Sequence, residues 1–207
     1  MDTSTNKITV FEKLLRASIE DRITSETTSI KAMQWFKEKY PTLKPSDLTQ
    51  REFLADKDRR RRNPLPGRLY MFLYKPKGKA ILPYYDKFPL VFPFRKVEGG
   101  FFGLNMHYLS PIYRAKLMDG LYDTISGTTN LDENTKLKIS YKILESASKY
   151  KWFKPCVKHY LTSHMASHLI YIEPNEWNLA LFVPTEQFMK TKKTNVWQDS
   201  KRVVNGI

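Results

Sequence analysis

Hydrophobic residues in the first 56 positions recur at steps of three and four. Two series show this spacing, one from Ile8 to Ile19 and one from Ile30 to Phe36. Each predicts a short amphipathic helix, because residues three or four apart share one helical face. Pro41 ends the second series, and Pro45-Ser46-Asp47-Leu48 is typical of another helix start. Residues 1–56 are therefore predicted to form an N-terminal helical region.

The periodic pattern stops between residues 57 and 67, where charge replaces hydrophobic spacing. Four consecutive arginines, Arg59 to Arg62, are followed by Pro64, Pro66 and Gly67. This composition disfavours a packed element, since charges resist burial and prolines lack a backbone donor. We predict a basic linker or loop over residues 57–67.

Beyond Gly67 the hydrophobic residues gather into short aromatic and branched runs bounded by Pro and Gly, which is typical of strands. The predicted strands cover residues 68–74, 90–94, 101–108, 168–172 and 177–183. Glu98-Gly99-Gly100 predicts a tight hairpin turn between the second and third of them.

Helical spacing returns at 113–122, 132–150 and 155–168, so a helical insertion of about residues 112–167 is expected inside a β-rich domain of residues 68–185. A basic C-terminal tail, residues 186–207, would follow. Strands and helices do not alternate regularly, which argues against a parallel sheet. The predicted fold class is α+β, with N-terminal helices followed by a small bent antiparallel sheet or SH3-like barrel.

Composition identifies a chain with enough apolar residues for a core and a large excess of positive charge. It has 207 residues, 41% of them hydrophobic, and a formal net charge of +14. Such a charge attracts polyanions, nucleic acid first and an anionic membrane surface second. No run of 18 apolar residues is present and Met1 to Lys13 lacks a secretory signal, so we predict no membrane insertion and a cytoplasmic location. The single cysteine, Cys156, agrees with a reducing compartment.

The charge is concentrated in three segments. Arg51 to Lys79 holds ten basic and three acidic residues, half of the total excess, while Lys136–Lys158 and Lys190–Arg202 are smaller clusters. Arginine binds phosphate through two parallel charge-assisted hydrogen bonds, and lysine acts as a point charge. The predicted DNA contacts are Arg59, Arg60, Arg61, Arg62, Arg68, Lys75, Lys77, Lys79, Lys149, Lys151, Trp152, Lys154 and Lys158.

Two of these predictions have plain structural alternatives. The arginine run is also what a solvated linker or a contact with an acidic protein would contain. Trp152, among lysines and next to Phe153, has the composition of a base-stacking platform, yet apolar residues just before Pro155 more often anchor a chain to its core.

Candidate catalytic and metal-binding residues give weak signals. Cys156, His159, His164 and His168 include zinc-ligand types, but their spacing matches no recognised zinc motif. On a strand, Asn105 and His107 would share a face and suit phosphate chemistry, although local hydrogen bonds account for such a histidine more often.

Asp86, Asp119 and Asp123 are magnesium-ligand types in turn or helical contexts, where helix capping or salt bridges explain them equally well. Phosphate-loop, dinucleotide and nucleophile-elbow motifs are absent from the sequence. We therefore predict a protein that is not an enzyme and uses no metal or cofactor.

Several phrases resemble a protein family of T4-like myoviruses, the DNA end-protector type. They span roughly Pro66 to Arg202 and lie at residues 66–70, 82–91, 103–109, 153–156, 176–184 and 196–200. The resemblance implies a minor virion protein that sits on the genome terminus and shields it from host exonuclease. It implies no particular functional residues.

The combined hypothesis is non-catalytic binding to double-stranded DNA at genome ends, in the virion and in the host cytoplasm during assembly. The expected protein partners are other virion proteins of the portal, neck or tail. The main alternative is a structural neck, tail or baseplate component whose basic loop meets acidic neighbours rather than DNA. A phage nuclease using Asn105 and His107 is the third.

Overall fold

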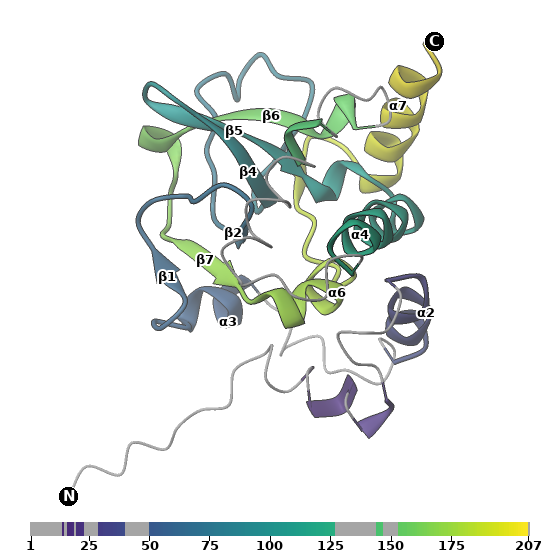
Figure 1. The fold of residues 1–207 in the computed structure, drawn as a ribbon. Coiled ribbons are helices and arrows are strands. Elements are labelled where there is room, and N and C mark those ends of the chain that lie inside the picture. The colour runs from purple at the N-terminus through teal and green to yellow at the C-terminus, as the bar shows by residue number, and fades with distance from the viewer. Residues whose placement is uncertain are drawn as a thin grey trace, which may run out of the picture.

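The computed structural model of the chain combines helices with a mostly antiparallel sheet, which confirms the α+β class (Figure 1). It describes residues 14, 16–18, 20–22, 29–39, 50–126, 144–146 and 153–206. The predicted helix over 132–150 lies mostly outside this range, as does much of the one over 8–19. The residues described within those two segments are helical.

The described elements follow in chain order. They are α2 (Ser29–Lys39), α3 (Gln50–Ala55), β1 (Arg60–Arg61), β2 (Leu69–Met71), β3 (Tyr85–Asp86), β4 (Leu90–Val97), β5 (Gly100–Asn105), η3 (Met106–Tyr108), α4 (Pro111–Ser126), η4 (Lys154–Cys156), β6 (Val157–Leu161), η5 (Thr162–His164), β7 (Leu169–Ile172), η6 (Pro174–Glu176), α6 (Trp177–Ala180), β8 (Phe188–Met189) and α7 (Lys193–Asn205).

Six strands form one antiparallel sheet in the order β1-β7-β2-β4-β5-β6, and β3 pairs with β8 separately. The outer strands β1 and β6 do not pair with each other, so the sheet is open and the SH3-like barrel is not confirmed. An isolated bridge between Tyr74 and Met165 joins the chain after β2 to the β6–β7 connection.

The predicted hairpin is present and joins β4 to β5. Val97 pairs with Gly100, and Gly99 occupies the left-handed region with φ 68°. A side chain at Gly103 would lie 2.3 Å from the side chain of Val91, and a register shift between Pro93 and Arg95 marks a bulge in β4. Glycine and the bulge together let these strands bend closely over one another.

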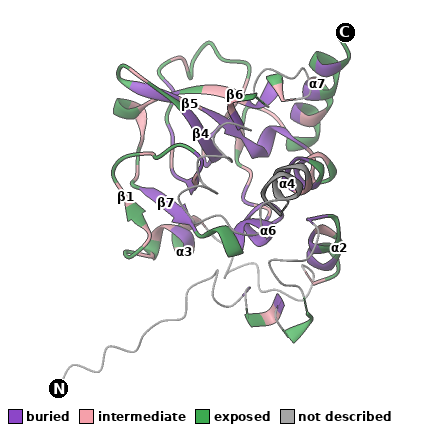
Figure 2. Ribbon diagram, in the orientation of Figure 1, coloured by how far each residue is buried: buried purple, intermediate pink, exposed green. Residues whose placement is uncertain are grey.

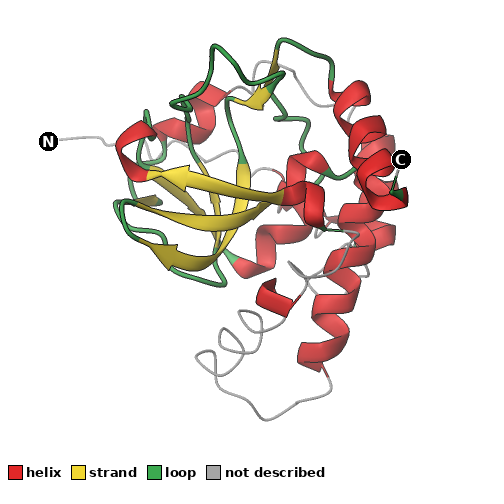
Figure 3. Ribbon diagram, turned by 90° about the horizontal axis from the view of Figure 1, so that it is seen from above, coloured by secondary structure: helices red, strands yellow, loops and turns green. Residues whose placement is uncertain are grey.

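The two faces of the sheet are buried in different ways (Figure 2). One face contributes Met71, Phe92 and Ile170 to the main core, which the helices α2, α4 and α6 complete on one side of the molecule (Figures 1 and 3). Trp177 of α6 meets Phe92 edge-to-face at 4.9 Å. The opposite face holds a smaller, aromatic-rich cluster: Tyr70, Phe72, Tyr74, Val91, Phe101, Tyr160, Leu169 and Tyr171.

The helix predicted over 155–168 is wrong, because the chain forms the short η4, then the edge strand β6 and then η5. Phe101 pairs with Tyr160 along β5 and β6, and their rings stack at 5.3 Å. Pairing with a distant strand outweighs the local helical spacing here.

The strand predicted over 177–183 is also wrong. Pro174 opens a 3-10 turn in which Glu173 and Glu176 form a capping box, and α6 follows directly. Trp177 donates its indole N–H to the carbonyl of Ile172 at 3.0 Å, which fixes this turn against the end of β7.

Two further segments are more ordered than their charge predicted. Within residues 57–67, Arg60 and Arg61 form β1 and pair with Ile170 and Leu169 of β7. Residues 186–207, expected as a tail, contain β8 and the helix α7, whose Val196 is fully buried.

Candidate nucleic-acid interface

An open groove of about 540 Å³ lies beside β1, at the exposed edge of the sheet. Arg61 and Arg62 line one side, and the chain between β6 and β7 lines the other with Thr162 and residues 165–168. In Figures 1 and 2 this edge lies opposite the helices α2 and α4, and β1 is coloured as exposed. The groove thus combines two adjacent guanidinium groups with hydroxyl and imidazole side chains.

A tyrosine ring positions two of the arginines. The guanidinium carbons of Arg61 and Arg68 lie 5.6 and 5.2 Å from the ring centre of Tyr171, which β7 contributes. Arg61 also donates to the carbonyl oxygens of Asp58 and Arg60. Cation–π contacts of this kind contribute about 0.5–1 kcal/mol at exposed sites, enough to orient a side chain while leaving donors available.

Within the part of the chain that the structure describes, Arg61, Arg62 and Arg68 form no ion pair with a carboxylate. Three like charges gathered at one edge repel each other, and the attraction of an anion placed among them offsets that repulsion. The geometry is therefore suited to a phosphate backbone, which carries regularly spaced negative charge.

Arg59 differs from the arginines that follow it. Both of its terminal nitrogens donate to the carboxylate of Glu176, and its Nε lies 2.9 Å from Asp56. The Glu176 side chain is only 4% exposed. Arg59 thus ties β1 to the turn before α6. Its neighbour Arg60 is exposed and donates to the carbonyl of Leu54 at 2.9 Å.

The loop after Tyr74 places three predicted contacts on the surface. Lys75, Lys77 and Lys79 are all exposed. The backbone N–H of Lys75 donates to the carbonyl of His164, so this loop begins next to η5. Lys190, with φ 72°, donates its amine to the carbonyls of Ala80 and Leu82 and holds the far side of the loop.

The remaining described candidates lie on η4 and on strand β6. Lys154 is exposed in η4, which packs against α7, and Lys158 is partly buried over the ring of Tyr108 at 4.0 Å. At its other end β6 leads through η5 to the arginine groove. Lys149, Lys151 and Trp152 lie outside the described residues.

A scan against protein-family models matches residues 2–204 to the family described as phage T4 terminal DNA protecting protein. This chain belongs to that family. No curated protein sequence and no solved structure gives a significant match. Family membership supports a phage protein that protects genome ends, in agreement with the resemblance seen in the sequence.

The surroundings of His107 are those of a structural residue. The His107 side chain is fully buried, with Nδ1 2.7 Å from Asp86 and Nε2 3.3 Å from the hydroxyl of Thr185. Asn105 donates to Asp86 and to the hydroxyl of Tyr160 at 3.1 and 3.0 Å. Local hydrogen bonds account for this histidine, as one of the two sequence interpretations expected.

Other polar candidates in this family member also have structural partners. Asp119 accepts the backbone N–H of Ser29 at 2.5 Å and so caps the start of α2. Burial raises the pKa of the Cys156 thiol to about 12, which disfavours the thiolate that binds metals. Among the described residues, no group of three His, Cys, Asp or Glu side chains is placed to hold a metal ion, and no helix is long and apolar enough to span a bilayer.

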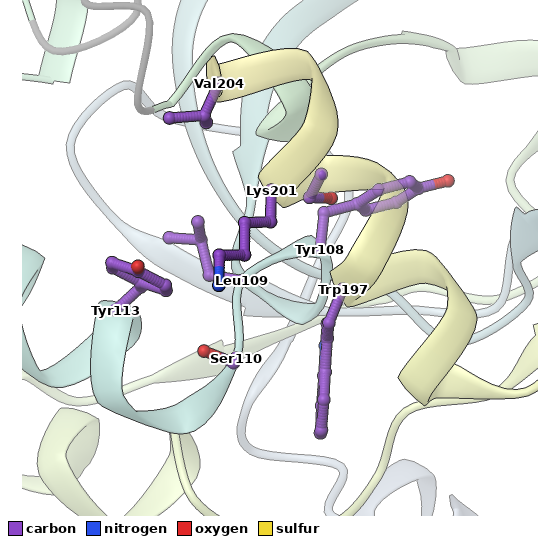
Figure 4. Close-up of a pocket in the computed structure, with 8 residues that line it drawn as sticks. Tyr108, Leu109, Ser110, Tyr113, Trp197, Lys201 and Val204 are labelled. Carbon is purple, nitrogen blue, oxygen red and sulfur yellow. The ribbon is translucent and has the colours of Figure 1, made fainter. Parts of the chain in front are cut away.

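A second, much smaller cavity lies where α7 packs on the start of α4 (Figure 4). Its volume is about 30 Å³, and Tyr113, Trp197 and Val204 are among its lining residues. Such a space holds one or two water molecules. It is too small for a nucleotide, so in this family member it is a packing gap between helices.

Sequence reasoning missed the groove's second side. Thr162, Ser167 and His168 were expected on a helix, and Tyr171 only as a strand residue. The small polar run at residues 162–168 was a usable signal, because such a run is typical of an exposed connection rather than of a packed helix.

Proposed function

We propose that this chain binds the ends of double-stranded phage DNA without catalysis and thereby blocks exonuclease access to the genome. The observation that carries the proposal is the set of three arginines, Arg61, Arg62 and Arg68, gathered at an exposed edge with no carboxylate partner among the described residues. Backbone contacts of this kind supply sequence-independent affinity, which suits a protein that must accept a terminus by its charge and shape.

The basic residues define a path longer than the groove. From the groove it passes Lys75 and runs along β6 to Lys158 and Lys154, with Lys77 and Lys79 on the adjoining loop. The strand part of this path, β6, is five residues long, which is about 16 Å at roughly 3.3 Å per strand residue. That length matches about five base pairs of duplex at about 3.4 Å per step.

Steric occupation is sufficient for protection, so the mechanism needs no chemical step from the protein. An exonuclease must reach the terminal phosphodiester, and a protein held there by several phosphates denies it access. The buried position of His107 supports this non-catalytic function, because a general base has to come within hydrogen-bond reach of its substrate.

The proposed setting is the virion, and the host cytoplasm while particles assemble. Portal, neck or tail proteins are the proposed neighbours. The alternative, that the groove meets an acidic virion protein instead of DNA, uses the same arginines and predicts little affinity for naked duplex.

An exonuclease-protection assay tests the proposal. Blunt linear duplex is incubated with the purified protein and then with a duplex-specific exonuclease, and full-length DNA is measured over time. The test variant, called the groove variant, carries Arg61→Gln and Arg62→Gln in the groove and Arg68→Gln over the Tyr171 ring. The control removes three positive charges elsewhere, by Lys116→Gln, Lys201→Gln and Arg202→Gln.

The wild type and the control are expected to slow digestion, and the groove variant to leave digestion close to the rate without protein. Equal protection by the groove variant would remove these arginines from the interface. No protection by the wild type would overturn the DNA-end function itself.

A further inference from the structure

A third cavity, separate from the arginine groove and from the gap beside α7, lies behind the loop that follows Tyr74. Its volume is about 330 Å³. Strand β6 supplies one wall and the loop supplies the other, to which Pro76, Leu82 and Pro83 belong. This volume is at the lower end of the range of about 300–1,000 Å³ found for small-molecule pockets, the size class of a single nucleotide.

Lys158 is the charged side chain that distinguishes this pocket from a packing gap. Its amine lies over the Tyr108 ring at 4.0 Å, and no carboxylate among the described residues pairs with it. Burial lowers the pKa of Lys158, which means that the charged form is poorly solvated there. An anion in the pocket would compensate this cost.

The rest of the lining suits a nucleobase. Tyr74, Tyr84 and Tyr85 present aromatic rings, and base–aromatic stacking contributes about 1–3 kcal/mol per base whatever the base. Asn105, Asp86 and Tyr160 form the polar floor.

The one carboxylate of this floor is already well supplied with donors. Asp86 accepts from Asn105, His107 and the backbone N–H of Phe88. A phosphate therefore fits at the Lys158 end of the pocket, and the base fits against the tyrosines.

The loop wall is held in place rather than left open. Pairing of Tyr85 with Met189 fixes the end of the loop, and Lys190 binds the carbonyls of Ala80 and Leu82. Lys190 adopts φ 72°, a backbone conformation that is uncommon outside glycine. A strained residue that secures the wall of a pocket is consistent with a preformed binding site.

Strand β6 lines the pocket, and the chain that directly follows β6 lines the groove. Lys158 is four residues from Thr162 of the groove, about 13 Å at roughly 3.3 Å per residue. A strand whose duplex part follows the groove would bring its last nucleotide to the pocket.

We propose that this pocket captures the terminal nucleotide of a DNA strand, with its phosphate on Lys158 and its base among Tyr74, Tyr84 and Tyr85. The inference rests on the proposed binding to DNA ends and explains how an end is distinguished from internal duplex. A closed duplex has no free nucleotide to insert, so the groove would bind both forms and the pocket only the open one.

The test compares a linear duplex that carries one unpaired, 5′-phosphorylated nucleotide at each end with a closed circle of matched length. Binding is measured for the wild type, for Lys158→Met and for Lys116→Met. Lys116 is a fitting control because it too lies over a tyrosine ring, that of Tyr113 at 5.8 Å, but it is exposed on α4 outside the pocket.

We expect the wild type and Lys116→Met to prefer the linear duplex by at least about tenfold, and Lys158→Met to bind both DNAs alike. Free thymidine 5′-phosphate should compete with the linear duplex but not with the circle. If thymidine 5′-phosphate binds but the preference for linear over circular DNA persists in its presence, the pocket binds free nucleotides instead. That result would overturn capture of an end.

Thermal unfolding separates a binding role of Lys158 from a structural one. Removing a poorly solvated charge should leave the melting temperature of Lys158→Met unchanged or higher, whereas a structural lysine would lower it. An unchanged linear preference in the folded Lys158→Met variant would overturn the pocket proposal alone. Absence of binding to either DNA by the wild type would instead overturn the function on which it rests.

Discussion

The arginines of this protein lie in two contrasting environments. Arg114 is fully buried and donates to the carbonyls of Leu109 and Leu181 and, at 2.5 Å, to the carboxylate of Glu186. Arg61 and Arg62 lie at the open sheet edge with no carboxylate partner among the described residues. The charge of Arg114 is neutralised inside the fold, whereas the charges of Arg61 and Arg62 remain available to a partner molecule.

The contrast shows that the number of basic residues in a segment does not measure its binding surface. Arg59 stands in the same run as Arg62, yet Glu176 and Asp56 occupy its guanidinium. The carboxylate partners of each arginine must therefore be known before a phosphate contact is assigned to it. The predictions below test this division, from the largest expected effect to the smallest.

Arg114→Met should be the most damaging of these substitutions. It leaves the Glu186 carboxylate buried without its partner, a loss that typically costs about 3–5 kcal/mol. The free energy of unfolding, measured by urea denaturation and circular dichroism, reports the change. Arg202→Gln, at a side chain that is 67% exposed, is the control and should change stability little. Equal effects of the two substitutions would mean that the Arg114–Glu186 pair is not structural.

Acid should weaken the same pair. Burial by itself would raise the pKa of Glu186, but Arg114, His107 and Lys193 outweigh it and lower the pKa to about 2. Because the pKa is lower in the folded state than in the unfolded one, the stabilisation is present above about pH 4.5 and is lost as the pH falls towards 2.

The double variant Arg114→Met with Glu186→Gln removes this titration and is the reference for it. On acidification, the unfolding free energy of the wild type should fall by about 3 kcal/mol relative to that of this variant. A difference that does not change with pH would show that Glu186 titrates alike in both states.

Arg59→Met should destabilise the fold by about 1–3 kcal/mol, since hydrogen bonds to charged groups are lost and Glu176 stays buried. Its effect on DNA affinity should be small once the folded fraction is taken into account. Urea denaturation and a duplex-binding titration, both compared with Arg62→Gln, measure the two effects. A large loss of DNA affinity at full stability would place Arg59 with the groove arginines.

Arg62→Gln should have the smallest effect on stability, below about 0.5 kcal/mol, because the side chain is exposed. Its effect on DNA binding should be larger than that of Arg59→Met. The slope of log affinity against log salt should become shallower by about 0.9, the value for one phosphate contact. An unchanged slope would remove Arg62 from the interface.

Local chemistry made part of this fold predictable. The hairpin at Glu98-Gly99-Gly100 follows from glycine's access to positive φ, and the helix α4 follows from its hydrophobic spacing. The localisation of charge between Arg51 and Lys79 also pointed to the segment that lines the groove.

The features that sequence reasoning missed depend on distant contacts. β6 forms because Val157–Leu161 pairs with β5, and the ion pair of Arg59 joins residues 117 positions apart. Neither leaves a local pattern. The turn before α6 did leave one, because proline and two glutamates at capping-box spacing indicate a helical start that the neighbouring β-branched and aromatic residues concealed.

The central claim is that the arginines without carboxylate partners bind DNA phosphates, and salt-dependent binding tests it most directly. Affinity for one blunt duplex is measured between about 50 and 200 mM salt for the wild type and for the variant with Arg61→Gln, Arg62→Gln and Arg68→Gln. The groove variant should retain its fold and show a slope shallower by about 2.7, which is three phosphate contacts. The same slope in both proteins, or equal loss in the control with Lys116→Gln, Lys201→Gln and Arg202→Gln, would contradict the claim.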